Sequence, residues 1–424
     1  MAYVADLHLH SRFSRACSTQ INIPNMAKWA KFKGIDLLGT SDFLHPIWFA
    51  ELKQNLKEVG NGLYESNGVK FLLTTEISCI YTDKGKCRRI HLVIFMPSFE
   101  SVAKLSAELI NRKVNLASDG RPITGLSAKT ICEIVFSIEK TAIIIPAHIW
   151  TPWFSLFGSE SGYDFFKECF GEFSDSIYGI ETGLSSEPTM NWRIADLDNK
   201  AILSFSDAHS LPNLGREATI FKGRLTFDEL RNDLITQNIM GTIEFFPEEG
   251  KYHWSGHRNC DVIMGPEDVK VNGEICPKCN RKMTIGVSER VEKLATRSVK
   301  DLDLETVDGV IKSKAFPKRP GFRMLVGLEK IIAEAFEKSV GTQKVRNEYD
   351  KLVMNLDCEL KILTKTPIDL IKQYSGEKIA DGVNRVRQGK LSIKPGYDNT
   401  YGVIKIWDGT ETEENSEDQL ALFS

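Results

Sequence analysis

Histidine and carboxylate side chains recur at the points where short apolar segments of the chain end. The first of these segments ends in the sequence DLHLH at residues 6–10. Because side chains alternate along a strand, Asp6, His8 and His10 are expected on one face. Asp207 and His209, in the segment SFSDAHS, repeat this spacing of two residues. Imidazole and carboxylate groups that converge in this way are ligands for divalent cations.

Later apolar segments end in side chains of the same kinds, namely Asp42, Glu76, His91, His148 and Glu181. The carboxyl ends of strands form one ligand-binding rim in parallel α/β proteins, so these groups are expected to meet there. Any one of them alone is more often a hydrogen-bonded core residue or a strand-end cap. Burying the whole set is costly unless cations neutralise it, and we therefore expect two or three divalent ions at the rim.

The ligand types also indicate the chemistry. Mixed imidazole and carboxylate ligands suit Zn²⁺, Mn²⁺ or Fe²⁺ better than Mg²⁺, which stays a candidate. Such ions lower the pKa of a bound water and hold the attacking and leaving oxygens, which suits hydrolysis of a phosphoester. A nucleotide cofactor is not expected, because no Gly-rich dinucleotide turn follows the first strand.

A second metal pattern lies between residues 253 and 279. His257 and Cys260 form one clip, Cys276 and Cys279 form another, and fifteen residues separate the two clips. This spacing predicts a tetrahedral site for one Zn²⁺, with His253 as the alternative fourth ligand. Protein side chains fill all four positions, so this zinc is expected to be structural.

The elements that position these residues can be read from the apolar pattern. Through about residue 245, strand-length apolar segments alternate with helical patterns at 24–34, 101–112, 127–139 and 226–238. Strands this apolar, separated by helices, predict parallel strands covered on both faces. The fold class is therefore an α/β barrel or a doubly wound sheet.

The chain is expected to contain four parts. Residues 1–246 form the α/β unit and residues 247–292 the zinc module. Residues 293–407 are predicted to be mainly helical with a terminal hairpin, because apolar residues recur there at helical spacing. Residues 408–424 are acidic and poor in apolar groups, which predicts a disordered tail.

The charge and composition of the chain indicate which kinds of partner and location to expect. The net charge of the chain is −3 at pH 7, but residues 247–407 carry 29 basic and 23 acidic side chains. A mildly basic C-terminal half is compatible with a polyanionic partner. The sequence has no apolar run long enough to span a membrane and no secretory signal pattern, so a cytoplasmic location is expected. The chain is also expected to be a monomer.

The strings DLHLHS, TTEIS, PAHIW and SDAHS resemble motifs of the polymerase-and-histidinol-phosphatase (PHP) superfamily. That resemblance implies a distorted seven-stranded (β/α) barrel with up to three metal ions at its rim. The ligands it implies are His8, His10, Glu76 as a bridging carboxylate, His91, His148, Asp207 and His209.

The chain departs from the motifs of the superfamily at one position. Many members carry Thr-Asp-His where this chain has Thr40-Ser41-Asp42, so Asp42 is expected to replace an imidazole as a metal ligand. Whether His45 or Glu181 joins the metal site stays open. Asp207, Glu76 and His209 are the residues expected to carry catalysis.

The barrel together with the segments that follow it resembles one family within the PHP superfamily. The barrel, the zinc module, and the segments RPGFRMLVGLEKIIAEAF and IKPGYDNTYGVIKIW together resemble the endonuclease Q family over essentially the whole chain. That resemblance implies a DNA repair endonuclease that cuts 5′ to deaminated bases (hypoxanthine, xanthine, uracil) and abasic sites. The lesion nucleotide would be extruded from the stack before cleavage. ATP-driven unwinding is not expected, because the sequence has no Walker-type loop.

Two further predictions concern contacts with partners. Aromatic side chains that follow His148 could stack on bases, and arginines near the motif ends could bind phosphates. The expected DNA contacts are Trp150, Trp153, Phe154, Arg12, Arg15, Arg88, Arg89, Arg193 and Arg216. The C-terminal peptide resembles the short hooks by which repair proteins bind a DNA sliding clamp, through Gln419, Leu420, Leu422 and Phe423.

Two other functions are compatible with the same residues. The first is a phosphomonoesterase or a 3′ exonuclease on the same barrel. The second is a DNA- or clamp-binding scaffold without catalysis, although the nearly complete ligand set argues against it.

Overall fold

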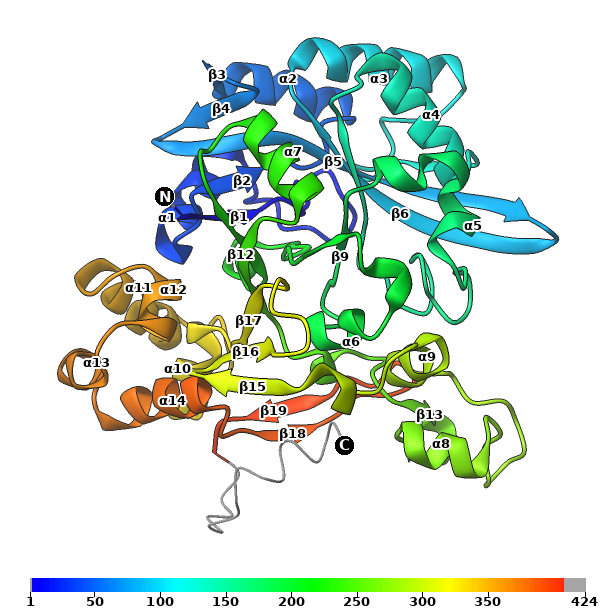
Figure 1. The fold of residues 1–424 in the computed structure, drawn as a ribbon. Coiled ribbons are helices and arrows are strands. Elements are labelled where there is room, and N and C mark those ends of the chain that lie inside the picture. Colours follow the sequence, from blue (N-terminus) through cyan, green and yellow to red (C-terminus); the bar gives the residue numbers. More distant parts are fainter. Residues whose placement is uncertain (1, 408–424) are drawn as a thin grey trace.

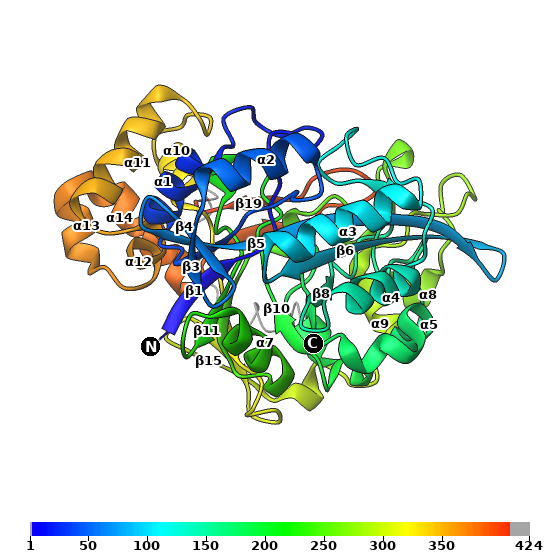
Figure 2. The same ribbon diagram turned by 90° about the horizontal axis from the view of Figure 1, so that it is seen from above.

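The structure of the chain is a computed structural model that describes residues 2–407. The central feature is a distorted barrel of seven strands, of which the first five belong to one large sheet and the last two form a separate two-stranded sheet (Figures 1 and 2). In chain order these strands are β1 (Ala2–Asp6), β2 (Leu37–Gly39), β5 (Val69–Asp83), β6 (Lys86–Met96), β8 (Ile143–Pro146), β9 (Gly179–Glu181) and β10 (Ala201–Leu203). The chain beyond β10 returns to the chain beyond β1, where Leu9 forms a parallel bridge with Ala208.

The strand directions depart from the prediction of parallel strands at β11 (Ala218–Lys222), which runs antiparallel to both of its neighbours, and at β6. The pairs β1–β2, β2–β5 and β9–β10 are parallel, whereas β6 runs antiparallel to both β5 and β8. At β6 the reason is local, because only Lys84 and Gly85 connect β5 to β6, and both have positive φ. A two-residue turn of this kind closes a hairpin, and parallel neighbours need a much longer crossover.

Further strands widen the sheet on both sides of the barrel. On one side β1 pairs with β11 (Ala218–Lys222), which pairs with β12 (Ile239–Glu244). Strands from the C-terminal part of the chain continue this edge, namely β17 (Gly321–Met324), β16 (Val310–Ser313) and β15 (Leu304–Val307). On the other side lie β4 (Leu63–Ser66), β3 (Lys57–Gly60) and β7 (Ile123–Thr124). The C-terminal part therefore shares a sheet with the barrel.

Helices cover the barrel, and those over residues 23–33, 99–111, 128–138 and 227–236 lie where the sequence predicted them. The covering helices are α1 (Ile23–Lys33), α2 (Pro46–Asn55), α3 (Phe99–Asn111), α4 (Ala128–Ile138), α5 (Phe166–Phe170), α6 (Pro188–Trp192) and α7 (Phe227–Thr236). Helix α1 begins where the Asn22 side chain accepts a hydrogen bond from the Asn25 amide. It ends at Gly34, whose φ of 86° is left-handed and favours glycine. Short 3₁₀ turns lie at Gly171–Ser176, Ala195–Leu197, Leu211–Asn213, Pro247–Glu249, Arg258–Cys260 and Lys300–Leu302.

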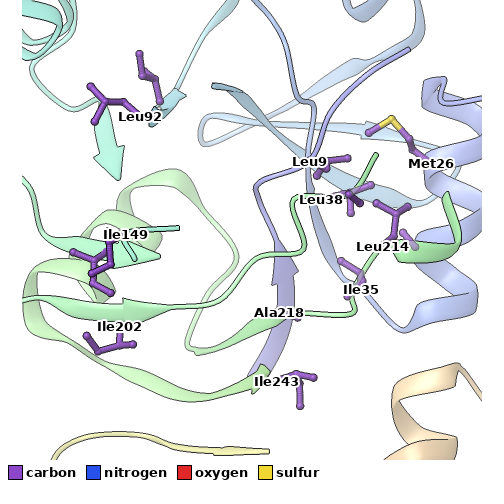
Figure 3. Close-up of a cluster of buried hydrophobic side chains, with 14 of the residues drawn as sticks. Leu9, Met26, Ile35, Leu38, Leu92, Ile149, Ile202, Leu214, Ala218 and Ile243 are labelled. Atoms are coloured by element: carbon purple, nitrogen blue, oxygen red, sulfur yellow. The ribbon is translucent and has the colours of Figure 1, made fainter. Parts of the chain in front are cut away.

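Apolar side chains pack between the strands and these helices. Figure 3 shows part of this core, in which residues from the strands and from α1 lie together. Met26 of α1, Leu38 of β2 and Leu92 of β6 are each fully buried. Burying apolar surface from separate elements stabilises the barrel and holds the strand ends in place.

The zinc module and the C-terminal helices are packed beside the barrel (Figures 1 and 2). The module contains β13 (Ser255–His257), β14 (Val262–Met264), α8 (Pro266–Asn272) and α9 (Val287–Leu294). The C-terminal helices are α10 (Leu328–Ala335), α11 (Gln343–Asn355), α12 (Glu359–Thr364), α13 (Ile368–Ser375) and α14 (Glu377–Gln388), and the chain then forms the antiparallel hairpin β18 (Ser392–Lys394) and β19 (Val403–Lys405).

Two sets of contacts join these parts. Lys33 of α1 forms a buried ion pair of 2.5 Å with Glu359 of α12. The loop of the terminal hairpin binds the start of the module, since the Gly396 carbonyl accepts a hydrogen bond from the Trp254 amide at 3.0 Å.

None of the helices within residues 2–407 is long and apolar enough to cross a membrane. The predicted acidic tail and clamp peptide lie outside the described residues.

Candidate metal centre

Seven side chains place their ligand atoms in three overlapping groups at one end of the barrel. Each group contains three ligand atoms that lie within 4.8 Å of one another. The groups are His8, His10 and Glu76; Glu76, His91 and His148; and His10, Asp207 and His209. Glu76 and His10 each belong to two groups, so the three groups form one continuous centre.

Different elements bring these ligands together. Glu76 and His91 are diagonal neighbours on one face of the β5–β6 hairpin, because His91 pairs with Ser78, two residues after Glu76. His8 and His10 follow β1, and Asp207 follows β10, where its amide donates to the His8 carbonyl at 2.8 Å. His148, just after β8, and Asp207 have φ values of 29° and 45°. Left-handed backbone at side chains of this kind is uncommon and clusters at functional sites.

Glu76 has the geometry of a bridging carboxylate. Its Oε1 lies 2.6 Å from His91 Nδ1 and 3.4 Å from His148 Nε2. Its Oε2 lies 3.1 Å from His10 Nε2 and 3.6 Å from His8 Nε2. The two oxygens of one buried side chain therefore face two different sets of imidazoles.

Several of these buried atoms make no hydrogen bond of good geometry within residues 2–407, although Glu76 Oε1, His10 Nε2 and Asp207 Oδ1 each have an oppositely charged atom within 3.1 Å. The atoms concerned are His8 Nε2, His10 Nε2, His91 Nε2, Glu76 Oε1 and Asp207 Oδ1. A buried polar atom without a well-formed hydrogen bond is costly, and so many in one place need an explanation. Divalent cations would satisfy all of them, and the mixture of imidazole and carboxylate donors fits Zn²⁺ or Mn²⁺.

Two carboxylates support the centre from behind. Glu181 lies 2.9 Å from His8 Nδ1 and accepts a hydrogen bond from the His148 amide at 2.8 Å. Asp42, which the sequence predicted as a ligand, lies behind His10 and outside the three groups. Its oxygens accept from the Ser11 amide and the Ser14 hydroxyl, and one lies 3.2 Å from His10 Nδ1. Carboxylates in such positions orient metal-bound histidines and raise their basicity.

His45, whose part in the site was left open, lies at the start of α2. Its Nδ1 faces the Trp48 amide at 3.5 Å, and its ring stacks on Phe13 with centroids 4.3 Å apart. His45 therefore caps a helix and is absent from the three ligand groups of the described chain.

The electrostatics of the centre keep its carboxylates ionised. Burial raises the pKa of Glu76, but the nearby His91 and Arg121 outweigh this and hold it well below its usual range. Burial lowers the pKa of His8, yet Glu181 and Glu76 raise it well above its usual value. Anionic groups thus surround the imidazoles, and metal binding at these histidines would release protons.

Arg121 belongs to the centre, although no sequence pattern indicated it. Its Nη1 lies 3.1 Å from Glu76 Oε2, and its side chain is 28% exposed. Arg121 comes from the irregular segment between α3 and β7, where no periodicity predicts which way a side chain points.

A cavity of about 240 Å³ adjoins the metal ligands. His148 and Asp207 line one end of it, and Thr151 and Ser185 line its wall. Several further lining residues come from the start of the zinc module, among them Lys251, Tyr252 and His253. The module therefore completes a hollow that the barrel alone would leave open.

The zinc module gathers the four predicted ligands. His257, Cys260, Cys276 and Cys279 place their ligand atoms within 4.8 Å of one another. His253, the alternative ligand, lies elsewhere, with its Nε2 3.1 Å from the Ser288 hydroxyl. Burial raises the pKa of the Cys276 thiol, but the amides of Lys278 and Cys279 lower it to about 6. A thiolate is the form that binds zinc.

The predicted DNA contacts fall into two classes. Trp150 is fully buried and donates to the Asn191 side chain at 2.8 Å, so it cannot stack on a base. Arg193 is 9% exposed and pairs with Glu292. Arg216 donates to the Ser206 carbonyl at 2.9 Å and supports the loop of Asp207. The structure gives these three side chains internal roles.

The other residues predicted to contact DNA are partly or fully exposed. Trp153 and Phe154 are partly exposed. The Arg89 guanidinium lies over the Phe154 ring at 5.4 Å, and Arg88 lies over Tyr163 at 3.9 Å. Arg12 forms an ion pair of 2.6 Å with Glu51, and Arg15 is exposed.

The chain is similar to two solved structures over 99% of its length. One is the lesion-specific endonuclease PfuEndoQ from Pyrococcus furiosus, with a TM-score of 0.82 and 31% sequence identity over 99% of that chain. The other is an endonuclease Q in complex with a 27-mer duplex that carries an abasic lesion at the active site. Its TM-score is 0.82, and its sequence identity is 32% over 100% of that chain.

Two matches at the sequence level cover parts of the chain. Residues 327–390 match the family model described as the MJ0043 C-terminal domain. The uncharacterized protein MJ0043 of Methanocaldococcus jannaschii is 29% identical over 265 residues, which are 61% of this chain. The match spans only 31% of the length of that relative.

Proposed function

The chain belongs to the endonuclease Q family, and we propose that it is a metal-dependent DNA repair endonuclease. Its substrate is duplex DNA with a deaminated base (hypoxanthine, xanthine or uracil) or an abasic site, and it hydrolyses the phosphodiester on the 5′ side of the lesion. The observation that carries the proposal is the three overlapping groups of ligand atoms, several of which are buried and make no well-formed hydrogen bond within the described chain. The similarity over 99% of the chain to an endonuclease bound to abasic DNA supports the choice of substrate.

Seven side chains would hold two or three divalent ions, with Zn²⁺, Mn²⁺ and Mg²⁺ as the candidates. They are His8, His10, Glu76, His91, His148, Asp207 and His209. Ions held there supply an activated water and neutralise charge on the phosphate. Glu181 and Asp42 orient His8 and His10, and Glu76 links the groups.

The cavity beside His148 and Asp207 is the proposed receptacle for the extruded nucleotide. Its volume of about 240 Å³ and its mainly apolar surface suit the flat face of a base. Extrusion is easiest for a mispaired or missing base, which gives a physical reason for selecting damaged sites. Trp153 and Tyr252, whose rings are 5.5 Å apart, stand at this side of the site and are proposed to contact the DNA.

The additional parts are proposed to position DNA and partners. One structural Zn²⁺ bound by His257, Cys260, Cys276 and Cys279 would fix the module that lines the cavity. Residues 293–407 are proposed to bind the duplex beside the barrel. The C-terminal peptide at Gln419–Phe423, outside the described residues, is proposed to bind a sliding clamp.

One assay tests the activity directly. End-labelled duplexes, each with a single hypoxanthine, uracil or abasic site, are incubated with the protein and Mg²⁺, Mn²⁺ or Zn²⁺, and the nick is mapped. A single nick 5′ to the lesion supports the proposal. A ladder from the 3′ end would indicate an exonuclease, and release of terminal phosphate without a nick would indicate a phosphomonoesterase.

Two variants separate catalysis from binding. Asp207→Ala should abolish cleavage and retain binding to lesion duplexes. Asp228→Ala, which changes an exposed carboxylate of α7, should leave cleavage unchanged. Binding to lesion DNA without cleavage by the unaltered protein under every metal condition would instead indicate a scaffold.

A further inference from the structure

The segment that carries Arg121 is held rigidly over the metal centre. The Gly120 amide donates to the Phe13 carbonyl at 3.0 Å, and the Pro122 carbonyl accepts from the Ser78 amide at 3.0 Å. A side chain at Gly120 would not fit, because a Cβ there would lie 2.3 Å from Asp42 Oδ2. The backbone on both sides of Arg121 is therefore fixed, and its guanidinium is placed in advance of any ligand.

The Arg121 guanidinium is bonded to Glu76 on one side and is partly exposed to solvent. Its Nη1 donates to Glu76 Oε2 at 3.1 Å. Glu76 is buried, whereas the Arg121 side chain is 28% exposed. Arginine presents five donors in a planar fork, so a single guanidinium can hold Glu76 and still offer donors to a second anion.

No other lysine or arginine in residues 2–407 lies within ion-pair distance of Glu76 or Asp207. Glu76 and Asp207 are the two carboxylates among the ligands, and Glu181 and Asp42 behind them are each paired with a histidine. Two divalent ions carry more positive charge than the two ligand carboxylates can balance. A permanent third cation so close to the ions is unfavourable unless an anion enters with the substrate. The position of Arg121 therefore indicates a place for an anionic oxygen beside the ions.

We propose that Arg121 binds a non-bridging oxygen of the scissile phosphodiester and stabilises the charge that develops on it during hydrolysis. This inference rests on the proposed function of the metal centre. It assigns Arg121 a catalytic role that complements the ions, since a fixed guanidinium aimed at developing charge lowers the barrier to reaction. The competing interpretation is that Arg121 only neutralises Glu76 and keeps that ligand in place.

The two roles give different results in three measurements. Arg121→Ala should lower kcat/KM on lesion duplexes by about 100-fold, the typical effect of removing one such donor. The bound metal content, measured by mass spectrometry, should stay unchanged. For the metal-free protein, the slope of log Kd against log salt concentration should flatten by about 0.9, because one phosphate contact is lost.

Two further variants sharpen the comparison. Arg121→Lys keeps one charge, so it should retain the salt slope and recover only part of kcat/KM. Arg112→Ala removes an arginine of the same loop region that pairs with Glu108 at the end of α3 and should change none of the three measurements. A loss of bound metal, or an unchanged salt slope together with an unchanged kcat/KM in Arg121→Ala, would overturn the proposal.

The test also separates this inference from the function on which it rests. Bis(4-nitrophenyl) phosphate is a phosphodiester without a base or a duplex, and it reports the metal centre alone. If the unaltered protein hydrolyses this compound but nicks no lesion duplex, the proposed DNA substrate is wrong. The effect of Arg121→Ala on the small diester would then still decide the role of Arg121.

Discussion

His8 and Glu181 meet on the side of the imidazole that faces away from the metal centre. His8 Nδ1 lies 2.9 Å from Glu181 Oε1, while His8 Nε2 faces Glu76 and Asp207. The same carboxylate accepts a hydrogen bond from the His148 amide at 2.8 Å. One buried side chain of β9 therefore orients ligands that follow β1 and β8.

Glu181→Gln is expected to weaken metal binding without removing a ligand. The neutral amide no longer polarises His8, and loss of such a support typically costs 10- to 100-fold in metal affinity. Titration of the metal-free protein with Zn²⁺ or Mn²⁺ measures this directly. Glu172→Gln, an exposed carboxylate paired with Lys129, is the matched control. Equal affinities for the two variants would show that Glu181 has no role in metal binding.

Cys276→Ser is expected to remove one zinc ion and loosen the module. The thiolate of Cys276 is buried among the other three ligands, and zinc contributes on the order of 10 kcal/mol to the folding of small modules. Metal analysis should give one ion fewer, and limited proteolysis should cut within residues 247–292. Cys87→Ser changes an exposed cysteine and should alter neither result. Full zinc content in Cys276→Ser would mean that the ligand set is wrong.

Trp150 and Trp153 are expected to differ although they are only three residues apart. Trp150→Ala leaves a cavity in the core and should lower the free energy of unfolding by about 3 to 5 kcal/mol, as measured by denaturant titration. Trp153 is partly exposed beside Tyr252, so Trp153→Ala should weaken binding to a lesion duplex with little loss of stability. The assignment fails if Trp150→Ala folds as stably as the unaltered protein.

Glu244 is expected to make the protein less stable at alkaline pH. Burial raises the pKa of Glu244 to about 8, and Glu187 adds to this, while the hydroxyls of Thr182 and Ser204 hydrogen-bond it. Glu217, its neighbour across β11 and β12, is equally buried, and its pKa is also raised, by burial and then by Glu244. The folded protein holds the proton more tightly than the unfolded chain, so stability falls as the pH rises from about 4.5 to about 8.

Glu244→Gln keeps the shape of this side chain and removes its charge. The fall in Tm between pH 6 and pH 9 should therefore be smaller in Glu244→Gln than in the unaltered protein, by the equivalent of about 2 kcal/mol. Glu100→Gln, an exposed residue of α3 that pairs with Lys104, should show the unaltered fall. An identical pH profile for all three proteins would mean that Glu244 is ionised in the folded state at neutral pH.

Much of the metal centre could be predicted from local patterns. His8 and His10 are two residues apart at a strand end, and this spacing alone puts their side chains on one face. The two clips of the zinc module are recognisable for the same reason, since each clip is a short segment with a fixed reach. Helices α1, α3, α4 and α7 also lie where capping residues and apolar spacing predicted them.

Other features depend on which distant segments meet. Asp42 was predicted as a ligand from its place after a strand, but in the folded chain His10 stands between it and the other ligands. Arg193 and Trp150 were candidates for DNA contact, but Glu292 and Asn191, about 100 and 41 residues further along the chain, enclose them. Arg121 carries no local signal, because only the packing of its loop against β5 brings it to Glu76.

The sequence by itself determined the types of candidate ligand, their spacing along each strand and the two metal sites that they predict. The tertiary structure decided which of these groups face the ions, which stand behind them and which cation joins them. The physical reason is that strand periodicity fixes the direction of a side chain over a few residues only. The closure of the barrel, which joins Leu9 to Ala208, and the packing of the Arg121 loop are long-range events, and they set distances across the site that no local pattern fixes.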